Sequence, residues 1–356
     1  MKVFVGRCAV GVLAQRIATL FKSNSAYFAI WGNKMKRSPS LTVHLRRDKA
    51  KPATPASFGE SIVDVLKNAE NVGGDVDNEI FVDCEISDNA LVLTGSHHET
   101  NISKKILLRR PPFCPIKFLF EEPGLEDLPE DVKTRGVHVG AAVILESSDN
   151  SVFITRRSKT MRTFPHVWVP PGGHVDEGES IFEAGIREVE EESGIKIENG
   201  NSGSILGLWE SSFPPMRHLG LPKRHHIVVY LHFKLSETAA NISEKIQLET
   251  KEVDACTWLC SCVAEGIVST DKQFDFPKQT NVYLKQCHSF PNLCVKQMDY
   301  IDGILIGDKG ETQTGRIIST TPLFMDVGKN EDNERVSTGT KYALKLWLDL
   351  LKSRKG

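Results

Sequence analysis

The sequence has no apolar run long enough to cross a membrane as a helix. Such a span needs roughly 18 to 20 predominantly apolar residues in a row, and polar side chains interrupt every apolar stretch of the 356-residue chain before that length. A strong charge imbalance is missing as well, because 44 Lys and Arg residues face 46 Asp and Glu residues. We therefore expect no membrane partner, and the overall charge does not indicate a nucleic-acid-binding protein.

Recognisable cysteine motifs are absent too. The eight cysteines lie at positions 8, 84, 114, 256, 260, 262, 287 and 294, and no secretory signal precedes them. Their spacings match no standard zinc site built from paired cysteines, and a disulfide framework is not indicated. We therefore expect an intracellular protein in a reducing compartment, with the cytoplasm as its location.

Acidic residues are missing from the first 47 positions, which carry nine Lys and Arg residues. This pattern resembles a mitochondrial transit peptide. The alternative is a small folded N-terminal domain, in which residues 2–8 form a strand and the apolar residues that follow, at helical spacing, form a helix. We favour the folded domain and keep mitochondrial import as the alternative.

Three prolines between residues 109 and 115, followed by an acidic stretch at 121–131, interrupt regular structure and mark a domain boundary. We predict an N-terminal α/β domain at 1–118, a catalytic domain at 135–275 and a C-terminal extension at 276–356. The extension ends in an amphipathic helix at 337–351, where apolar side chains recur at helical spacing.

The catalytic domain has the pattern of an α/β fold. Short runs rich in β-branched and aromatic residues predict strands at 137–146, 151–157, 167–170, 205–211, 225–235 and 253–259. A single helix lies among them. Strands before and after one central helix predict a mixed β-sheet sandwiched between helices.

Local signals set the ends of that central helix. Ser180, followed three residues later by Glu183, is typical of a capping box at a helix start, and Gly194 supplies a left-handed stop. At 100° per residue one stripe of this helix is apolar and can dock onto the sheet. Its members are Phe182, Ile186 and Val189.

Acidic residues gather on a neighbouring face of the same helix. Glu188, Glu191 and Glu192 converge there, and residues 173–195 hold eight acids against one base, a net charge of -7. Like charges at this spacing repel, so a solvated surface explains the arrangement poorly. Clustered hard oxygen ligands are what Mg²⁺ and Mn²⁺ prefer, and a bound metal can bridge the carboxylates to an anionic substrate.

These residues resemble the Nudix box, with Gly, Glu, Arg-Glu, Glu-Glu and Gly at that family's spacing. The match comprises Gly173, Glu179, Arg187, Glu188, Val189, Glu191, Glu192, Gly194 and Ile195. The resemblance implies a Nudix fold and a metal-dependent hydrolase of nucleoside diphosphate-linked substrates.

The resemblance also implies a role for each residue of the box. Glu188 and Glu192 would be the principal metal ligands, and Glu191 a further ligand or a catalytic base. The backbone carbonyl of Gly173, or of Gly172 beside it, would be another ligand. Arg187 can pair with Glu191 one helical turn later and hold the carboxylates in place.

Many Nudix enzymes use one more acid from outside the helix. We expect Glu252 to supply it, with Asp254 and Glu210 as rivals. Arg156 and Arg157 are our candidates for contacts with the substrate phosphates. Other cations that flank the acidic segment in sequence could serve in the same way: Arg217, Lys223 and Arg224. Of the neighbouring pair His225 and His226, strand alternation lets at most one point into the site.

Further motifs resemble the nucleoside diphosphate-linked moiety X motif 17 subfamily. They lie at residues 109–115, 167–174, 225–231 and 334–348. This resemblance implies hydrolysis of the N7-methylguanosine cap of messenger RNA, with release of the methylated nucleoside diphosphate, so a nucleotide or capped RNA would be the partner. One alternative is a diphosphatase for coenzyme A, ADP-ribose or a nucleotide sugar. Another is a non-catalytic Nudix binding module. No feature indicates a particular protein partner.

Overall fold

The computed structural model describes residues 41–48, 50–70, 78–87, 90–95, 105–119, 124–198, 202–271, 299–325 and 334–354. The chain divides into two compact units, Met1–Pro39 and Ser40–Gly356. All described residues belong to the second unit, so the predicted N-terminal strand and helix lie outside them. No helix among the described residues is long and apolar enough to cross a membrane.

Most of the predicted catalytic-domain strands are confirmed to within one or two residues. The described strands are β1 (Thr42–Arg46), β2 (Thr54–Pro55), β3 (Glu79–Ser87), β4 (Ala90–Gly95), β5 (Ile106–Arg109), β6 (His138–Glu146), β7 (Ser151–Arg157), β8 (Val167–Val169), β9 (Gly172–His174), β10 (Ser204–Phe213), β11 (Arg224–Lys234), β12 (Val253–Cys260), β13 (Tyr300–Ile306), β14 (Thr312–Ser319) and β15 (Arg335–Val336).

The helices include the predicted central helix and the predicted C-terminal helix. The described α-helices are α2 (Ile62–Glu70), α3 (Glu130–Lys133), α4 (Ile181–Ser193), α5 (Ala239–Ser243), α6 (Ser261–Ser269) and α7 (Thr338–Ser353), and the 3₁₀ turns are η2 (Pro115–Phe118), η3 (Arg217–Leu219) and η5 (Pro322–Phe324).

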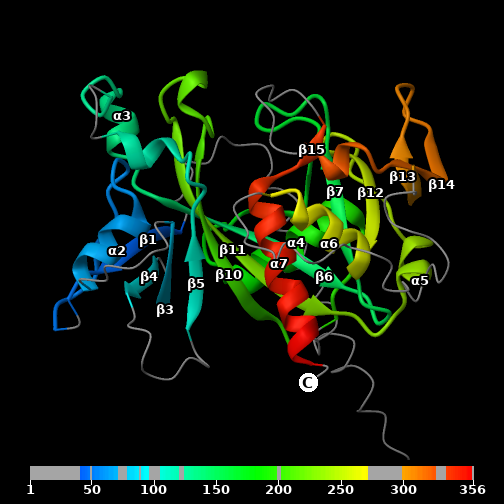
Figure 1. Cartoon of the computed structure of the whole chain (residues 1–356), viewed down its shortest axis with the longest axis horizontal. Helices are drawn as coiled ribbons and strands as arrows, with labels where there is room; N and C mark the ends of the chain where they lie inside the picture. The colour runs from blue at the N-terminus through cyan, green and yellow to red at the C-terminus, as the bar shows by residue number, and fades with distance from the viewer. Residues whose placement is uncertain are drawn as a thin grey trace, which may run out of the picture. The chain divides into compact units, whose positions relative to one another are not determined.

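The described strands pair into one mixed sheet, in the order β14-β13-β12-β7-β6-β11-β10-β5-β3-β4-β1-β2 (Figure 1). Because β1 pairs with β6 as well as with β4, the run from β6 through β11, β10, β5, β3 and β4 to β1 closes on itself. Strands from both sides of the predicted boundary near residue 118 therefore share this sheet. The domain boundaries given above stay predictions.

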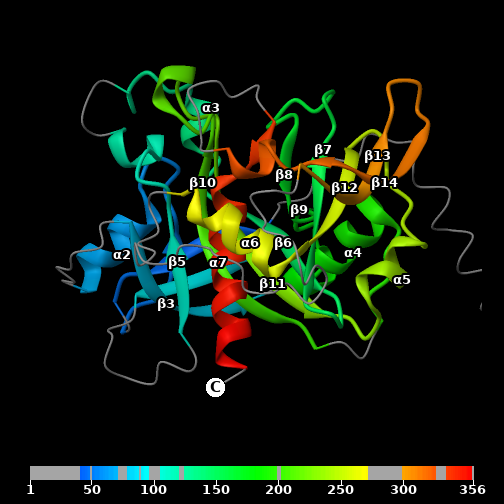
Figure 2. The same ribbon diagram turned by 45° about the vertical axis from the view of Figure 1, so that its right-hand side comes forward.

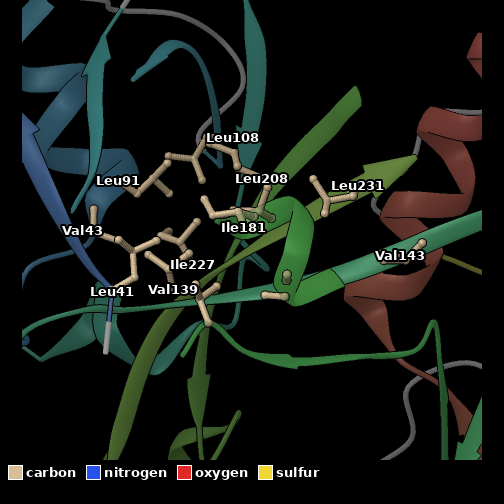
Figure 3. Close-up of a cluster of buried hydrophobic side chains, with 14 of the residues drawn as sticks. Leu41, Val43, Leu91, Leu108, Val139, Val143, Ile181, Leu208, Ile227 and Leu231 are labelled. Carbon is tan, nitrogen blue, oxygen red and sulfur yellow. The ribbon is translucent and has the colours of Figure 1, made fainter. Parts of the chain in front are cut away.

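Side chains alternate between the two faces of β6 and β11, as strand geometry requires. Val139 and Val143 point into one core together with Ile227 and Leu231, and Ile181 of α4 packs there too (Figure 3). The intervening residues join a second core with α6 and α7, of which Ala142, Ile144 and Tyr230 are members. Helices thus cover both faces of the sheet, as predicted.

The C-terminal helix α7 packs onto the sheet through buried Tyr342, Leu344 and Trp347. It is the red helix that crosses the sheet in Figures 1 and 2. Two strands of the C-terminal extension were not predicted from the sequence: β13 and β14 form an antiparallel hairpin that extends the sheet beyond β12.

Candidate active site on helix α4

Helix α4 has the ends that the sequence predicts. The Ser180 hydroxyl accepts a hydrogen bond from the Glu183 amide, and the Glu183 carboxylate accepts one from the Ser180 amide. Gly194 ends the helix with φ of 71°. The predicted apolar stripe packs on the first core, with Val189 buried and Phe182 and Ile186 partly buried. The acidic face is therefore held in a fixed orientation.

Glu188 lies against the backbone of β9. A Cβ atom at Gly173 would stand 2.6 Å from the Glu188 carboxylate carbon, which is closer than real Cβ atoms come. Only glycine allows this approach without a shift of the carboxylate. Burial raises the pKa of Glu188, while the positive charge of Arg187 opposes the rise. The first residue of the box thus makes room for its principal acid.

Glu192 is the most enclosed acid of the site, with 5% of its surface exposed. The Gly172 amide donates to one carboxylate oxygen at 3.1 Å, and the Thr155 hydroxyl donates to the other at 3.1 Å. Burial raises the pKa of Glu192 to about 8. Since desolvation penalises the charged form, a nearby cation would stabilise this carboxylate strongly.

Arg187 connects the acids of the box. Its guanidinium donates to both oxygens of Glu179, at 2.7 and 3.1 Å, and to Glu188 and Glu191 at 3.0 Å each. It also donates to the carbonyl oxygen of His174 at 3.0 Å. The expected pairing of Arg187 with Glu191 is present, and the helix is tied to the β9 backbone by the same side chain.

The donor set suits a divalent ion. Glu188, Glu191 and Glu192 present hard carboxylate oxygens, and Glu188 lies against the backbone of Gly173. Within the described residues, no three His, Cys, Asp or Glu side chains already stand together as a metal-holding group. The carboxylates instead accept hydrogen bonds from Arg187, Gly172 and Thr155. A bound metal would replace some of these partners.

Arg157 of β7 and Glu252 of the loop before β12 lie near this centre. The charges of Glu192, Glu252 and Glu188 act on the pKa of Arg157, although burial dominates and lowers it. Glu252 is exposed, and its charge also helps to raise the pKa of Glu188. Both side chains therefore lie within electrostatic reach of the predicted metal ligands, and their roles stay predictions.

The other cation predicted on β7 has different surroundings. Arg156 pairs with Asp254 at 2.6 Å and with Glu334 at 3.0 Å, and its guanidinium lies 5.7 Å from the ring centre of Trp168. Glu334 in turn accepts a hydrogen bond from the Trp168 ring nitrogen. These contacts favour a role for Arg156 in holding its neighbours in position. Asp254, one of the rival acids, is already paired with Arg156.

Glu210 lies outside this centre, so its place among the rival acids was wrong. Its side chain, on β10, is fully buried against the first residues of α2. The amides of Ile62 and Val63 donate hydrogen bonds to its two carboxylate oxygens. His225 lies 3.1 Å from the same carboxylate. No local sequence pattern predicts this role, because the two amide partners lie more than 140 residues away from Glu210 along the chain.

The fold and the carboxylate centre are those of a Nudix hydrolase, which is an enzyme class that acts on phosphoric anhydrides and generally needs a divalent metal. The NUDIX domain family model matches residues 136–263, and the chain belongs to the Nudix family. The predicted fold class and family are thereby confirmed.

The relatives extend the likeness beyond that domain. The m7GpppN-mRNA hydrolase NUDT17 of Xenopus laevis is 38% identical over 81% of this chain and 92% of its own length. The protein of the same name from Danio rerio is 35% identical over 89% of this chain and 98% of its own length. Among solved structures, the MutT protein from Methanosarcina mazei Go1 is 22% identical over 38% of this chain and 83% of that chain, with a TM-score of 0.28.

Proposed function

We propose that this Nudix hydrolase removes the N7-methylguanosine cap from messenger RNA and releases the methylated nucleoside diphosphate. The observation that carries the proposal is the reach of the similarity. Four relatives named m7GpppN-mRNA hydrolase are 35% to 38% identical, over at least 76% of this chain, whereas the domain itself spans residues 136–263. The similarity to these four relatives therefore extends beyond the Nudix domain that supplies the hydrolytic chemistry.

Mg²⁺ or Mn²⁺ is the proposed cofactor, held by Glu188, Glu192 and Glu191 with the carbonyl of Gly173. A divalent ion bound there would polarise the phosphoryl oxygens and make the attacking water more acidic. Arg187 keeps the carboxylates oriented through its hydrogen bonds.

Glu191 or Glu252 would accept the proton of the attacking water, since both carboxylates are exposed beside the centre. Arg157 would offset the negative charge of the phosphates. The water oxygen bonds to one phosphorus, and the bridging P–O bond breaks. The products are the methylated nucleoside diphosphate and an RNA with a 5′-monophosphate.

A parallel hydrolysis screen tests this proposal. Purified protein is given capped RNA, coenzyme A, ADP-ribose, a nucleotide sugar and a dinucleoside polyphosphate, each with Mg²⁺ and with Mn²⁺. Reactions in ¹⁸O-labelled water locate the broken bond by mass spectrometry. We expect capped RNA to have the highest kcat/KM. A higher kcat/KM on a small metabolite would support the metabolite diphosphatase instead, and binding without turnover would support the non-catalytic module.

We also propose an intracellular, reducing location for the protein. No disulfide joins the described cysteines, which are at 84, 114, 256, 260 and 262, and this suits such a compartment. Imaging of a C-terminally tagged full chain separates cytoplasm from mitochondria, and loss of the N-terminal residues on import would support the mitochondrial alternative.

A further inference from the structure

Basic side chains from three segments of the chain meet at the beginning of β6 and β11. The strand register places His226 of β11 opposite His138 of β6, and His174 of β9 opposite Gly140, two residues further along β6. Arg224 begins β11, and Arg135 lies just before β6. We call these five residues the histidine cluster.

The three histidines lie on one face of the sheet. Residues two apart on a strand share a face, so His138 lies with Gly140 and Ala142, and His226 lies with Val228 and Tyr230. Ala142 and Tyr230 belong to the core under α6 and α7. The histidine cluster is therefore on the side of the sheet away from α4, at the beginning of β6 and β11.

Electrostatics agree with this arrangement. Burial lowers the pKa of His226 to about 3, and the charges of His225, His174, Arg224 and His138 lower it further in that order. The pKa of His138 is lowered by burial first and then by His174, Arg135 and Arg224. His138 and His226 are therefore neutral near pH 7 and can donate an N–H to a phosphate, while Arg135 and Arg224 supply positive charge.

The cluster and the acids of α4 lie on opposite faces of β9. His174 follows Gly173, whose backbone lies against Glu188, and the His174 carbonyl accepts a hydrogen bond from Arg187. Because β9 pairs only with β6 among the described strands, a substrate held at the metal site would reach the histidine cluster around the other edge of β9.

A cavity lies close to the histidine cluster, next to the residues that precede β11. Arg135 donates to the carbonyl of Lys223 at 3.2 Å, and the preceding residues Gly220, Leu221 and Pro222 line a cavity of about 260 Å³. The four residue-to-residue steps from Pro222 to His226 span at most about 14 Å. The cavity and the cluster thus lie along one short stretch of chain.

The cavity has an aromatic wall. Phe118 and Arg217 line it, and the Arg217 guanidinium lies 5.3 Å from the centre of the Phe118 ring. Both kinds of side chain stack on unpaired bases. Sites for single-stranded nucleic acid combine such platforms with cations that follow the phosphate backbone.

We propose that the histidine cluster and the Phe118 cavity bind the first nucleotides of the RNA that follows the cap. The phosphodiester groups contact Arg135, Arg224 and the histidines, and a base enters the cavity against Phe118. This proposal rests on the proposed decapping function, because a small metabolite has no nucleotide chain to occupy the histidine cluster and the Phe118 cavity.

Binding in the absence of metal tests the site apart from catalysis. The protein in EDTA is titrated with a short, uncapped, 5′-monophosphorylated RNA, followed by fluorescence polarisation over a series of salt concentrations. Arg224→Gln and His138→Gln each remove a cluster side chain, and Phe118→Leu removes the aromatic face. Lys352→Gln is the charge-matched control, since Lys352 is exposed near the far end of α7.

We expect Arg224→Gln to weaken RNA binding about tenfold, as the loss of one charge-assisted hydrogen bond would. The slope of log affinity against log salt should fall by about 0.7 for each lost phosphate contact. Phe118→Leu should weaken binding without a change of slope, and Lys352→Gln should change neither quantity. Equal binding by wild-type protein and both cluster variants would overturn the proposal.

Kinetics separate this proposal from the proposed function. For each variant, kcat/KM is measured on capped RNA and on a cap dinucleotide, which lacks the following chain. The ratio of the two values should fall about tenfold in Arg224→Gln. A wild-type protein that binds RNA but leaves both capped substrates intact would contradict the decapping function alone. Hydrolysis of capped RNA with an unchanged ratio of the two kcat/KM values in every variant would contradict only RNA binding by the histidine cluster and the Phe118 cavity.

Discussion

Glu188 occupies the space that a side chain at Gly173 would need. A Cβ atom at position 173 would be 2.6 Å from the carboxylate carbon and would collide with one carboxylate oxygen. Gly173, the first residue of the Nudix box, therefore has to lack a side chain so that the Glu188 carboxylate can lie in its present position. Its role can be tested without touching any acid.

Gly173→Ala should lower kcat by about 10- to 100-fold, the usual cost of losing a partner that orients a metal ligand. The obstacle is the far end of a flexible side chain, which can swing away, so the thermal midpoint should hardly change. Steady-state kinetics in saturating Mg²⁺ and a melting curve measure the two quantities.

Gly178→Ala is the matched control, with the opposite expected pattern. A Cβ atom there meets nothing within 4 Å, but φ is +81°. The strain should cost about 1 kcal/mol of stability and leave kcat within a few-fold of wild type. If Gly173→Ala kept full activity, the contact with Glu188 would have no catalytic meaning.

Removing either charge of the proposed metal pair should abolish most of the activity. Glu188→Gln and Glu192→Gln keep the size of the side chain, and a glutamine at 192 can still bond with Gly172 and Thr155. We expect kcat to fall by more than the 10- to 100-fold typical of a lost outer-shell partner. Mn²⁺ affinity, measured by calorimetry, should weaken in parallel.

Full activity in either purified variant would contradict the assignment of Glu188 and Glu192 as metal ligands. Glu190→Gln is a suitable control, because that residue is an exposed acid of the same helix outside the box motif and pairs only with exposed Lys196 among its described contacts. Its kcat should stay near the wild-type value.

The sequence predicted those parts of the site that local geometry decides. The Ser180 cap and the Gly194 stop act within a few residues, so they fixed helix α4, and helical spacing alone brings Glu188 and Glu192 together. The histidine cluster was out of reach, because it depends on the register of β6, β9 and β11.

The role of Glu210 shows the same limit. Its carboxylate receives amides from α2, far away along the chain. No pattern near residue 210 announces that contact. The closure of the sheet from β6 to β1 likewise depends on pairings between distant segments.

Two acids near β12 should differ in what they do. Glu252→Gln should lower kcat by about 100-fold or more, as a lost general base does at the low end of its range, with an unchanged melting temperature. Asp254→Asn should instead lower stability, because it breaks the partly buried pair with Arg156. Melting curves and kcat on the same preparations check both expectations. The reverse pattern would identify Asp254 as the outside acid.

Glu146 ties the C-terminal helix α7 to the sheet. The buried carboxylate accepts hydrogen bonds from Trp347 and Arg354 at the two ends of the last helical turns, and from His232 and Lys234 on β11. It lies at the end of β6 opposite to the residues that pair with β9. Glu146→Gln should therefore destabilise the protein and spare kcat. The control Glu130→Gln removes an acid that is 81% exposed.

The loss of stability in Glu146→Gln should depend on pH. Burial alone would raise the pKa of Glu146, but the hydrogen bonds from His232, Lys234 and Trp347 outweigh it and lower the pKa from 4.5 to about 2. A depressed carboxyl pKa stabilises the folded state above the unfolded value, by about 3 kcal/mol for this shift. That contribution disappears as the pH falls from 4.5 towards 2, because the unfolded state takes up the proton first. Urea unfolding of wild type and variant should therefore show a difference that is constant near pH 6 and shrinks steadily below pH 4.5. A difference independent of pH over that interval would mean that the charge of Glu146 contributes nothing to docking α7.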